Sequence, residues 1–301
     1  MATKKKAAPA KATKGGKPVG SDGGKAAEVV EVPVVTEAEP SVAEAGSGAP
    51  AEAAGRAAKL RPYAAYAFRG TDIRGDIREK YGFDGDLLEL YASGTERVIN
   101  KWHHYLPLYD RYFARWRNRP FRFLEIGVSK GGSLDLWRRY FGPEAVIFGI
   151  DIDPKCAAFD GISGQVRIGS QDDPEFLARV VEEMGGVDVV LDDGSHLMPH
   201  VHKTFEVLFP KLSYGGTYMI EDLHTAYLRR YGGGFRSGEN FFNFARRMVD
   251  DMHRWYHTHG ERRPDLGPDC SGIHIHDSVA VFDKDRPFAP THSRVAARGR
   301  A

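Results

Sequence analysis

Short apolar runs alternate with helix-like stretches over the second half of the chain, and this alternation constrains the fold more than any other feature. The runs begin at Phe121, Ala145, Gln165, Val187 and Thr217. Helical patterns or turns stand between them, as in repeated strand–helix–strand units. Such units place parallel strands in one sheet with helices on both faces. We therefore predict a doubly wound α/β fold that binds ligands at the carboxyl ends of its strands.

Two further strands are predicted near the end of the chain. Residues 273–276 and 279–282 are short apolar runs that flank the break Asp277-Ser278. We expect these runs to close the sheet, and an antiparallel arrangement is open to them. A helix is expected before them, over residues 240–255. The complete sheet would then be mostly parallel and have seven strands.

The first part of the chain is predicted to be a disordered tail over residues 1–58. Residues 1–55 contain no Leu, Ile, Phe, Tyr or Trp, so they cannot bury enough apolar surface to offset the entropy lost on ordering. A helical segment that covers the active site is expected over 59–119, because aromatic residues recur there at helical spacing, with breaks near Gly94 and Pro107. The α/β domain would occupy 120–290, and a basic tail 291–301.

Composition argues against several classes of protein. Lys and Arg number 42 and Asp and Glu 41, so the chain has no net field that would attract nucleic acid or an anionic membrane. No apolar run approaches the roughly 20 residues of a membrane span, and the lysine-rich start lacks the apolar stretch of a signal peptide. The two cysteines have no metal-ligand spacing and are too few for a disulfide framework. We expect a cytoplasmic protein without membrane or nucleic-acid partners, and a homo-oligomer stays open.

Two of the predicted strands end in adjacent acids that are followed by a histidine. One stretch reads Val-Asp-Val-Val-Leu-Asp-Asp-Gly-Ser-His over 187–196, and the other reads Gly-Gly-Thr-Tyr-Met-Ile-Glu-Asp-Leu-His over 215–224. Acids grouped at two strand ends would repel one another without a cation. Their oxygens are the ligands that Mg²⁺ prefers. The pattern therefore predicts a metal site formed by both strand ends.

A glycine-rich turn, Gly-Val-Ser-Lys-Gly-Gly-Ser over 127–133, follows the first predicted strand. Its glycines let the backbone pass close to a ligand. The turn lacks the G-x-G-x-x-G and Walker patterns, which argues against a dinucleotide or a nucleoside triphosphate. Asp151 ends the second strand, where an acid commonly holds two ribose hydroxyls, and Ser170 and Gln171 follow the third, where an adenine edge would lie. Together these features indicate an adenosine-containing cofactor.

These motifs resemble class I S-adenosylmethionine-dependent methyltransferases, and more narrowly the macrocin and mycinamicin group of metal-dependent sugar O-methyltransferases. The resemblance covers about residues 94–284. It is carried by Leu-Glu-Ile-Gly-Val at 124–128, Gly-Ile-Asp-Ile-Asp-Pro at 149–154, Gly-Ser-Gln at 169–171, and the two acidic stretches above. It implies S-adenosylmethionine and Mg²⁺ as cofactors, and a hydroxyl of a sugar or glycosylated natural product as the methyl acceptor.

The resemblance also implies roles for single residues. By position, the metal ligands are Asp193, Glu221 and Asp222, and the general base is His196, whose ordinary pKa of about 6.5 suits that task. The family usually reads Gly-Thr-Asp-Lys where this chain has Gly-Thr-Glu-Arg at 94–97, which weakens a role for Thr95 without removing it. The cofactor-binding residues indicated by the turn and the family are Thr95, Glu125, Gly127, Gly131, Ser133, Asp151, Ser170, Gln171 and Asp192.

Several interpretations stay open. Asp192 and Asp193 could cap the following helix, and His224 could support the site rather than react. The aromatic stripe before residue 117 is expected to pack against the sheet. His200 and His202 are expected on a solvated helix face. His253 and His257 have metal-ligand spacing but lack the acid of an H-E-x-x-H motif, which argues against zinc.

Two alternative functions stay open beside sugar O-methylation. The chain could belong to the cephalosporin-hydroxylase-like relatives of this fold, with another small-molecule substrate. It could also be a catalytically idle binding protein whose lysine-rich tail contacts nucleic acid or a partner, although such a protein would be expected to have lost some of the acids or glycines above. The loop over 227–237 and the region before Gly94 are expected to shape the acceptor pocket, because loops carry specificity.

Overall fold

The computed structural model describes residues 66–258 and 267–295. Contacts divide the chain into residues 1–66 and 67–301, and the fold described below belongs to the second unit. The tail predicted over 1–58 lies outside the described residues. The same holds for residues 296–301 of the predicted C-terminal tail.

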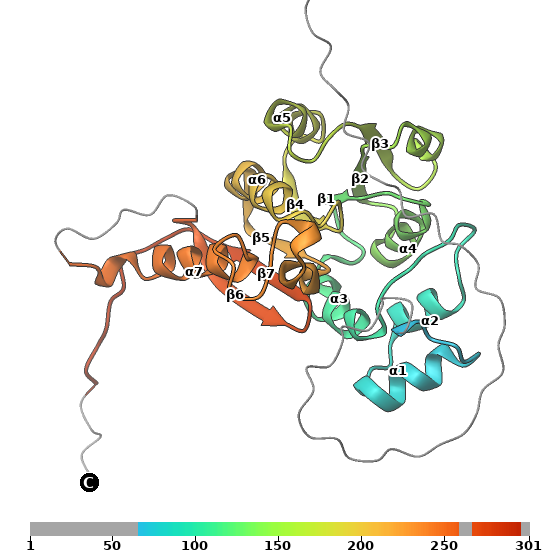
Figure 1. Cartoon of the computed structure of the whole chain (residues 1–301), viewed down its shortest axis with the longest axis horizontal. Helices are drawn as coiled ribbons and strands as arrows, with labels where there is room; N and C mark the ends of the chain where they lie inside the picture. The colour runs from blue at the N-terminus through green and yellow to red at the C-terminus, as the bar shows by residue number, and fades with distance from the viewer. Residues whose placement is uncertain (1–65, 259–266, 296–301) are drawn as a thin grey trace, which may run out of the picture. The chain divides into compact units, whose positions relative to one another are not determined.

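A seven-stranded sheet forms the centre of the described part of the chain (Figure 1). Its spatial order is β3-β2-β1-β4-β5-β7-β6. Strands β1 to β5 are parallel, whereas β7 is antiparallel to both of its neighbours. The predicted doubly wound, mostly parallel sheet is confirmed, and its closing pair is antiparallel. The strands are β1 (Phe121–Ile126), β2 (Ala145–Asp151), β3 (Gln165–Ile168), β4 (Val187–Asp192), β5 (Leu212–Ile220), β6 (Cys270–His276) and β7 (Val279–Lys284).

Helices cover both faces of this sheet, because its strands are apolar on both sides. Phe121 and Phe123 of β1 pack with one group of helices, and Leu124 and Ile126 pack with the other. The first group consists of α1 (Ile73–Tyr81), α2 (Asp86–Ala92), α3 (Leu106–Phe113) and α4 (Gly132–Phe141). The second group consists of α5 (Pro174–Glu183), α6 (Met198–Leu208) and α7 (Phe241–Met252).

Short 3-10 helices lie between these elements. Two of them flank α3 and belong to the aromatic stripe, and one follows the carboxyl end of β5. They are η2 (His103–Tyr105), η3 (Ala114–Trp116), η4 (Pro154–Phe159), η5 (Phe209–Lys211), η6 (Leu223–Tyr227), η7 (Arg229–Tyr231) and η8 (Arg254–Tyr256).

The helical segment expected over 59–119 contains α1, α2 and α3 among the described residues, and one expectation about histidines further along the chain was wrong. Helix α1 lies in this segment, although its sequence is mostly charged and only Ile77 is buried. The break expected near Pro107 is the boundary between η2 and α3, and Pro107 stands in the first turn of α3, where a missing N–H costs little. His202 is not solvated, since its ring stacks on Phe244 with centroids 4.5 Å apart and burial lowers its pKa.

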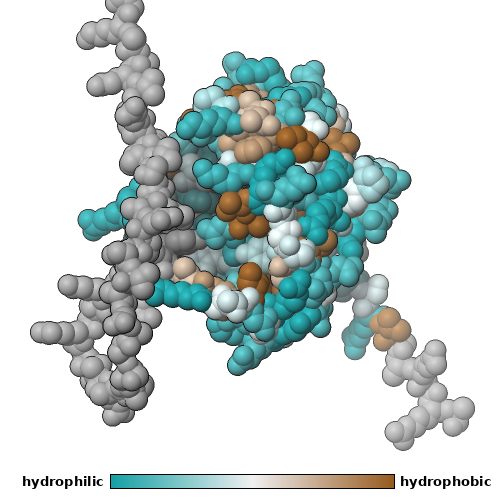
Figure 2. Space-filling view, turned by 90° about the vertical axis from the view of Figure 1, so that its right-hand side faces the viewer, coloured by the Kyte–Doolittle hydropathy of each residue, from teal (hydrophilic) through white to brown (hydrophobic). Residues whose placement is uncertain are grey.

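None of the helices described is long and apolar enough to span a membrane. On the face drawn in Figure 2, hydrophobic residues lie in small separate groups among hydrophilic ones.

Candidate active site

The carboxyl ends of three neighbouring strands bring the predicted acids together. Asp192 of β4 pairs with Ile126 of β1 and with Ile220 of β5. Backbone bonds continue this ladder beyond the strands, since Asp193 donates to the Ile126 carbonyl and Glu221 donates to the Asp192 carbonyl. The two acidic stretches therefore lie side by side, as the parallel sheet required.

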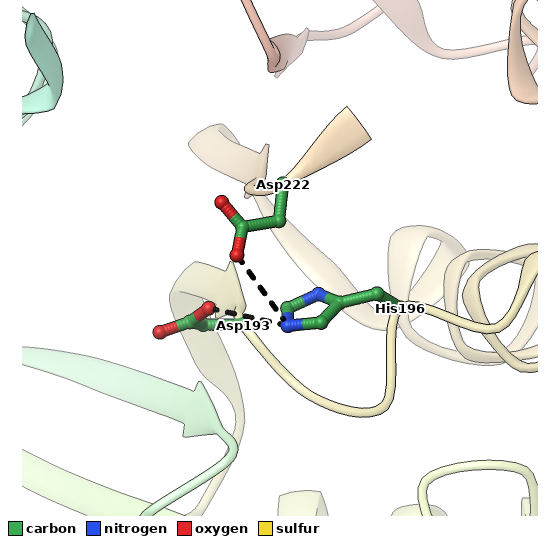
Figure 3. A group of neighbouring side chains, drawn as sticks. All are labelled: Asp193, His196 and Asp222. Carbon is green, nitrogen blue, oxygen red and sulfur yellow. Dashed lines mark ion pairs between the residues drawn. The ribbon is translucent and has the colours of Figure 1, made fainter. Parts of the chain in front are cut away.

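Asp193, His196 and Asp222 form a group with the spacing of metal ligands (Figure 3). One ligand atom from each residue lies within 4.8 Å of the others. His196 Nε2 is 3.6 Å from Asp222 Oδ2 and 3.9 Å from Asp193 Oδ1. His196 and Asp222 both have a left-handed backbone, with φ of 56° and 55°. Non-glycine residues seldom adopt this conformation, and its occurrence at both positions is typical of a functional site.

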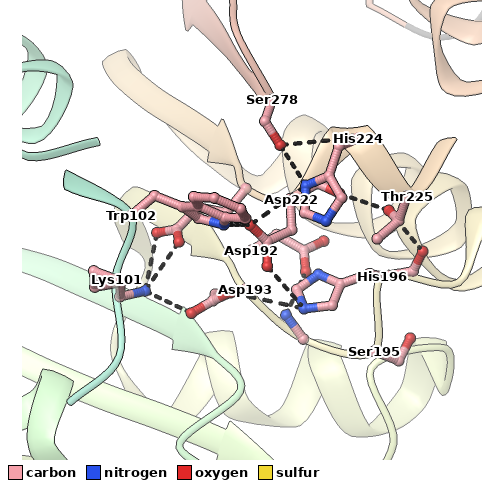
Figure 4. A network of polar contacts seen from close by, with 12 residues as sticks. Lys101, Trp102, Asp192, Asp193, Ser195, His196, Asp222, His224, Thr225 and Ser278 are labelled. Carbon is pink, nitrogen blue, oxygen red and sulfur yellow. Dashed lines mark hydrogen bonds and ion pairs between the residues drawn. The ribbon is translucent and has the colours of Figure 1, made fainter. Parts of the chain in front are cut away.

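Lys101 lies beside this group, and no pattern in the sequence indicated it (Figure 4). Its Nζ atom donates to Asp193 Oδ2 at 2.5 Å, and to Glu221 Oε1 and Oε2 at 3.1 and 3.0 Å. The lysine side chain is 3% exposed and that of Glu221 2%. Glu221 is therefore adjacent to the metal-like group but is paired with a cation of the chain.

Aromatic residues from the N-terminal helical segment bind the same carboxylates. Trp102 Nε1 and Tyr105 Oη donate to Asp222 Oδ1 at 3.0 and 2.7 Å, and Tyr109 Oη donates to Glu221 Oε1 at 2.6 Å. The stripe packs against the sheet as expected, yet its polar atoms reach the site. The signal in the sequence was that these rings carry O–H and N–H groups, which need partners when buried.

The charges of this group shift several pKa values. Burial by itself lowers the pKa of the Lys101 ammonium, but the charges of Asp193 and Glu221 outweigh burial and raise it. Burial and Asp193 raise the pKa of Glu221, against the effect of Lys101. Burial also raises the pKa of Glu125 to about 7 and that of Asp192 to about 6. Such clusters of shifted groups are typical of active sites.

The glycine-rich turn and Asp151 lie at the ends of β1 and β2, as predicted. Asp151 Oδ2 accepts from the backbone amides of Val128 and Ser129 at 2.9 and 2.8 Å, so the acid holds the turn in place. A Cβ at Gly127 would lie 2.1 Å from the Asp193 carbonyl oxygen. The loop after β4 therefore leaves no room for a side chain at position 127, independently of any cofactor.

Hydrogen bonds within the protein join four of the predicted cofactor-binding side chains, Glu125, Ser133, Gln171 and Asp192. Glu125 is fully buried and accepts from Ser133 Oγ and Trp137 Nε1 at 2.9 and 3.1 Å. Gln171 donates to Asp192 Oδ1 at 3.3 Å and accepts from the Ser195 amide at 2.6 Å. These contacts connect the turn after β1 and the loop after β3 to the acidic loop after β4.

The remaining predicted residues lie at the edges of the site. Thr95 Oγ1 donates to the Arg97 carbonyl at 2.5 Å, and the Arg97 side chain lies against Gly131, where a Cβ would be 3.0 Å from Arg97 Cδ. Ser170 donates to Asp172. Thr95 and Gly131 thus both contact Arg97, whereas Ser170 follows the end of β3.

His224 and the loop over 227–237, which was expected to shape the acceptor pocket, follow the acids at the end of β5. His224 Nδ1 is 2.7 Å from Ser278 Oγ, and burial lowers the histidine pKa. The loop lines an open cavity of about 700 Å³. The residues lining it are Tyr227, Arg229, Gly232, Gly233, Gly234, Phe235, Arg236 and Ser237.

Comparison with known proteins agrees with this geometry. Residues 124–223 match the family described as "Methyltransferase domain". The chain is 38% identical over 222 residues to 8-demethyl-8-(2-methoxy-alpha-L-rhamnosyl)-tetracenomycin-C 3'-O-methyltransferase of Streptomyces olivaceus, covering 70% of this chain and 56% of that one. It is 35% identical over 213 residues to mycinamicin VI 2''-O-methyltransferase of Micromonospora griseorubida, covering 67% and 53%. The chain thus spans about half the length of these curated relatives.

A solved structure supports the same relationship. It is the MycE methyltransferase from the mycinamycin biosynthetic pathway in complex with Mg and SAH, which is 33% identical to this chain with a TM-score of 0.61. The match covers 68% of this chain and 55% of MycE. The arrangement of strands and helices seen here is therefore the Rossmann-like methyltransferase fold.

Proposed function

We propose that this chain, which carries a methyltransferase domain related to sugar O-methyltransferases, transfers a methyl group from S-adenosylmethionine to a hydroxyl of a sugar or glycosylated natural product. The observation that carries the proposal is the group formed by Asp193, His196 and Asp222 at the carboxyl ends of β4 and β5. It combines two carboxylates and an imidazole, which together suit activation of a hydroxyl beside a cation.

The residues of this group fit a hard divalent cation. Asp193 Oδ1 and Asp222 Oδ2 are the oxygens nearest His196, and oxygen ligands are those that Mg²⁺ prefers. Bound there, Mg²⁺ would supply Lewis-acid polarisation of an acceptor hydroxyl, and S-adenosylmethionine would supply the electrophilic methyl group. Asp193 and Asp222 would hold the ion together with Glu221, the third ligand that the family resemblance implies.

The predicted cofactor residues fit an adenosine-containing ligand in part. Asp151 lies at the carboxyl end of β2, is partly exposed, and is adjacent to the glycine-rich turn. Ser170 follows β3 and is also partly exposed. Glu125 and Asp192 are 0% and 1% exposed, so we assign them to supporting the walls of this site through hydrogen bonds.

His196 is the residue that we propose to accept the proton of the acceptor hydroxyl. Its Nε2 faces both carboxylates at distances of 3.6 and 3.9 Å, which are longer than a hydrogen bond. His196 Nε2 is thus placed beside the position at which a metal-bound hydroxyl would lie.

The function is tested by replacing His196. His196→Ala is expected to reduce turnover about 10²- to 10⁴-fold, as removal of a general base typically does, while calorimetry shows S-adenosylmethionine binding within about threefold of wild type. The assay is mass spectrometry of methylated products from a panel of glycosylated acceptors. The matched control is His253→Ala, which removes an exposed histidine at the end of α7.

Undiminished turnover of His196→Ala would exclude its role as base, and full activity of the wild type in excess chelator would exclude the metal. Absence of S-adenosylmethionine binding to the wild type would contradict the proposal as a whole. In that case the idle binding protein becomes the better interpretation. A chain that binds the cofactor but methylates no glycosylated acceptor would favour another small-molecule substrate.

A further inference from the structure

The loop over residues 227–237, which forms the cavity, is joined to both segments of the proposed active site. The 3-10 helix η6 leads into this loop directly after Asp222. At about 2.0 Å per residue, this helix places the start of the loop about 10 Å from Asp222. Thr225 of η6 donates from Oγ1 to the His196 carbonyl at 3.5 Å (Figure 4). Further along the loop, a Cβ at Gly232 would lie 3.1 Å from a proline in the first turn of α6. The cavity is therefore within reach of an acceptor that has a substituent on its sugar ring.

The charge that lines this cavity has one sign. Among the described lining residues, Arg229 and Arg236 are charged and all others are neutral. Within residues 66–258 and 267–295, neither guanidinium forms a hydrogen bond or an ion pair, and that of Arg236 lies 5.1 Å from the ring centroid of its neighbour Phe235. A guanidinium carries five N–H donors in a planar fork that matches carboxylate and phosphate oxygens. The donors of both arginines are therefore open to an anion in the cavity.

Contacts within the protein hold the base of the loop in one conformation. Asn240 is 5% exposed, and its Nδ2 atom donates to the carbonyls of Ala226 and Gly234 at 2.9 and 3.2 Å. The Gly234 amide donates to the same Ala226 carbonyl at 2.8 Å. At Gly233 an added Cβ would lie 2.1 Å from that carbonyl oxygen, so the two sides of the loop are in direct contact. The loop is thus ordered before a ligand binds, which lowers the entropic cost of binding.

We propose that Arg229 and Arg236 bind an anionic group of the methyl acceptor, so that the chain prefers an acidic sugar to a neutral glycoside. The inference rests on the proposed function and narrows its acceptor class. A sugar phosphate, including a nucleoside diphosphate sugar, and a sugar carboxylate offer the same oxygen pairs to a guanidinium. The two arginines therefore determine specificity at a distance from the reacting hydroxyl, which is bound at the acids after β4 and β5.

The first test measures binding of matched acidic and neutral probes to the full chain by calorimetry. Phenyl glucuronide is compared with phenyl glucoside, and glucose 1-phosphate with methyl glucoside, in buffer without Mg²⁺ because phosphates bind that ion. The acidic member of at least one pair is expected to bind about tenfold more tightly or better. Preference in the phosphate pair indicates a phosphorylated acceptor, and preference in the glucuronide pair indicates a sugar acid. Equal affinities within both pairs, or no binding of either acidic probe, would overturn the proposal.

The second test removes each guanidinium. Arg229→Gln and Arg236→Gln are expected to weaken binding of the preferred acidic probe about tenfold each, because a charge-assisted contact is lost. The matched control is Arg230→Gln. Arg230 is an exposed neighbour in the same loop that does not line the cavity, and its guanidinium lies 5.1 Å from the ring centroid of Tyr231. This control removes the same charge and should leave the affinity within about twofold of wild type.

Equal weakening by all three variants would show a general effect of surface charge and contradict the assignment to the cavity, as would unchanged affinity in both Arg229→Gln and Arg236→Gln. Failure of this inference is distinguishable from failure of the proposed function. Methylation of neutral and acidic acceptors with equal kcat/KM would remove the anionic acceptor and leave methyl transfer intact. Binding of an acidic probe by a chain that does not bind S-adenosylmethionine would remove methyl transfer, and with it the role of the bound anion as acceptor.

Discussion

Glu125 shows at the residue scale how the protein accommodates an acid inside a buried strand. Its two oxygens accept from Ser133 and Trp137, yet burial raises its pKa to about 7 from the ordinary value of 4.5. The folded state holds the proton of Glu125 more tightly than the unfolded state does. The stabilisation of the fold by this proton is therefore complete below about pH 4.5. It is lost as the pH rises through about 7.

Glu125→Gln removes this titration and is expected to change the pH dependence of stability. As the pH rises from 4.5 to 8, the free energy of unfolding of the wild type should fall by about 2–3 kcal/mol relative to that of the variant. Urea unfolding at both pH values measures this difference. The control is Glu182→Gln at an exposed position of α5, and parallel stability curves for wild type and Glu125→Gln would refute the assignment.

Gly127 lets the turn after β1 pack directly against the loop after β4, because it has no side chain. Its φ of 93° is outside the range of ordinary residues, and a Cβ would lie 2.1 Å from the Asp193 carbonyl oxygen. Gly127→Ala is therefore expected to lower the free energy of unfolding by at least about 3 kcal/mol, since steric overlap with backbone adds to the conformational cost.

Gly161→Ala separates these two causes, because Gly161 has a φ of 77° but no atom within 4 Å of the added Cβ. It should cost only about 1 kcal/mol, the conformational part. Chemical denaturation of both variants at the same pH measures the comparison. Equal losses in the two would show that contact with the Asp193 loop is not what requires a glycine at 127.

At the scale of the secondary-structure elements, the sequence predicted the sheet well because each strand is an apolar run with a clear end. Strand β3 lies at the predicted residues, and β4 ends at the predicted acid. Helix α1 lies in the helical segment expected over 59–119, but its bounds could not be predicted because a charged helix with a single buried residue has no apolar periodicity. Strand β5 begins at Leu212, ahead of the predicted Thr217, since the glycines at 215 and 216 concealed its start.

The acids of the site could be predicted from sequence, but their partners could not. Adjacent acids at strand ends are a local pattern, and parallel strands force such ends together. Lys101 lies 92 residues from Asp193 and 120 from Glu221, so no local spacing relates them. The contacts of Trp102 and Tyr105 with Asp222 likewise depend on how the N-terminal helices pack on the sheet. The roles proposed for the site residues stay predictions until the variants above are measured.

At the scale of the whole described unit, the helices before β1 complete the site. Segment 101–109 provides donors to the acids after β4 and β5, and α1 braces this segment because Asp76 binds His103 at 2.7 Å. Ile77 of α1 is fully buried in the same core. Stability and site geometry should therefore depend on the chain from α1 onward.

This dependence places the boundary of the functional unit near residue 66, which deletion can test. Removal of residues 1–55 is expected to leave the melting temperature within about 1 °C and turnover within about twofold, because that stretch has too few apolar side chains to contribute a core. Calorimetry and the methylation assay measure both quantities.

Removal of residues 1–81 is the matched comparison, because it also deletes α1. It should lower the melting temperature by several degrees, since a buried isoleucine alone contributes about 2 kcal/mol or more and each kcal/mol corresponds to roughly 2–4 °C in a unit of this size. It should also disturb the site, because the deletion removes Asp76, which binds His103 at 2.7 Å in the segment that provides donors to the acids. If deletion of residues 1–55 lowered the melting temperature as much as deletion of residues 1–81, residues 1–55 would contribute to the fold. If deletion of residues 1–81 left the melting temperature unchanged, α1 would not contribute to it.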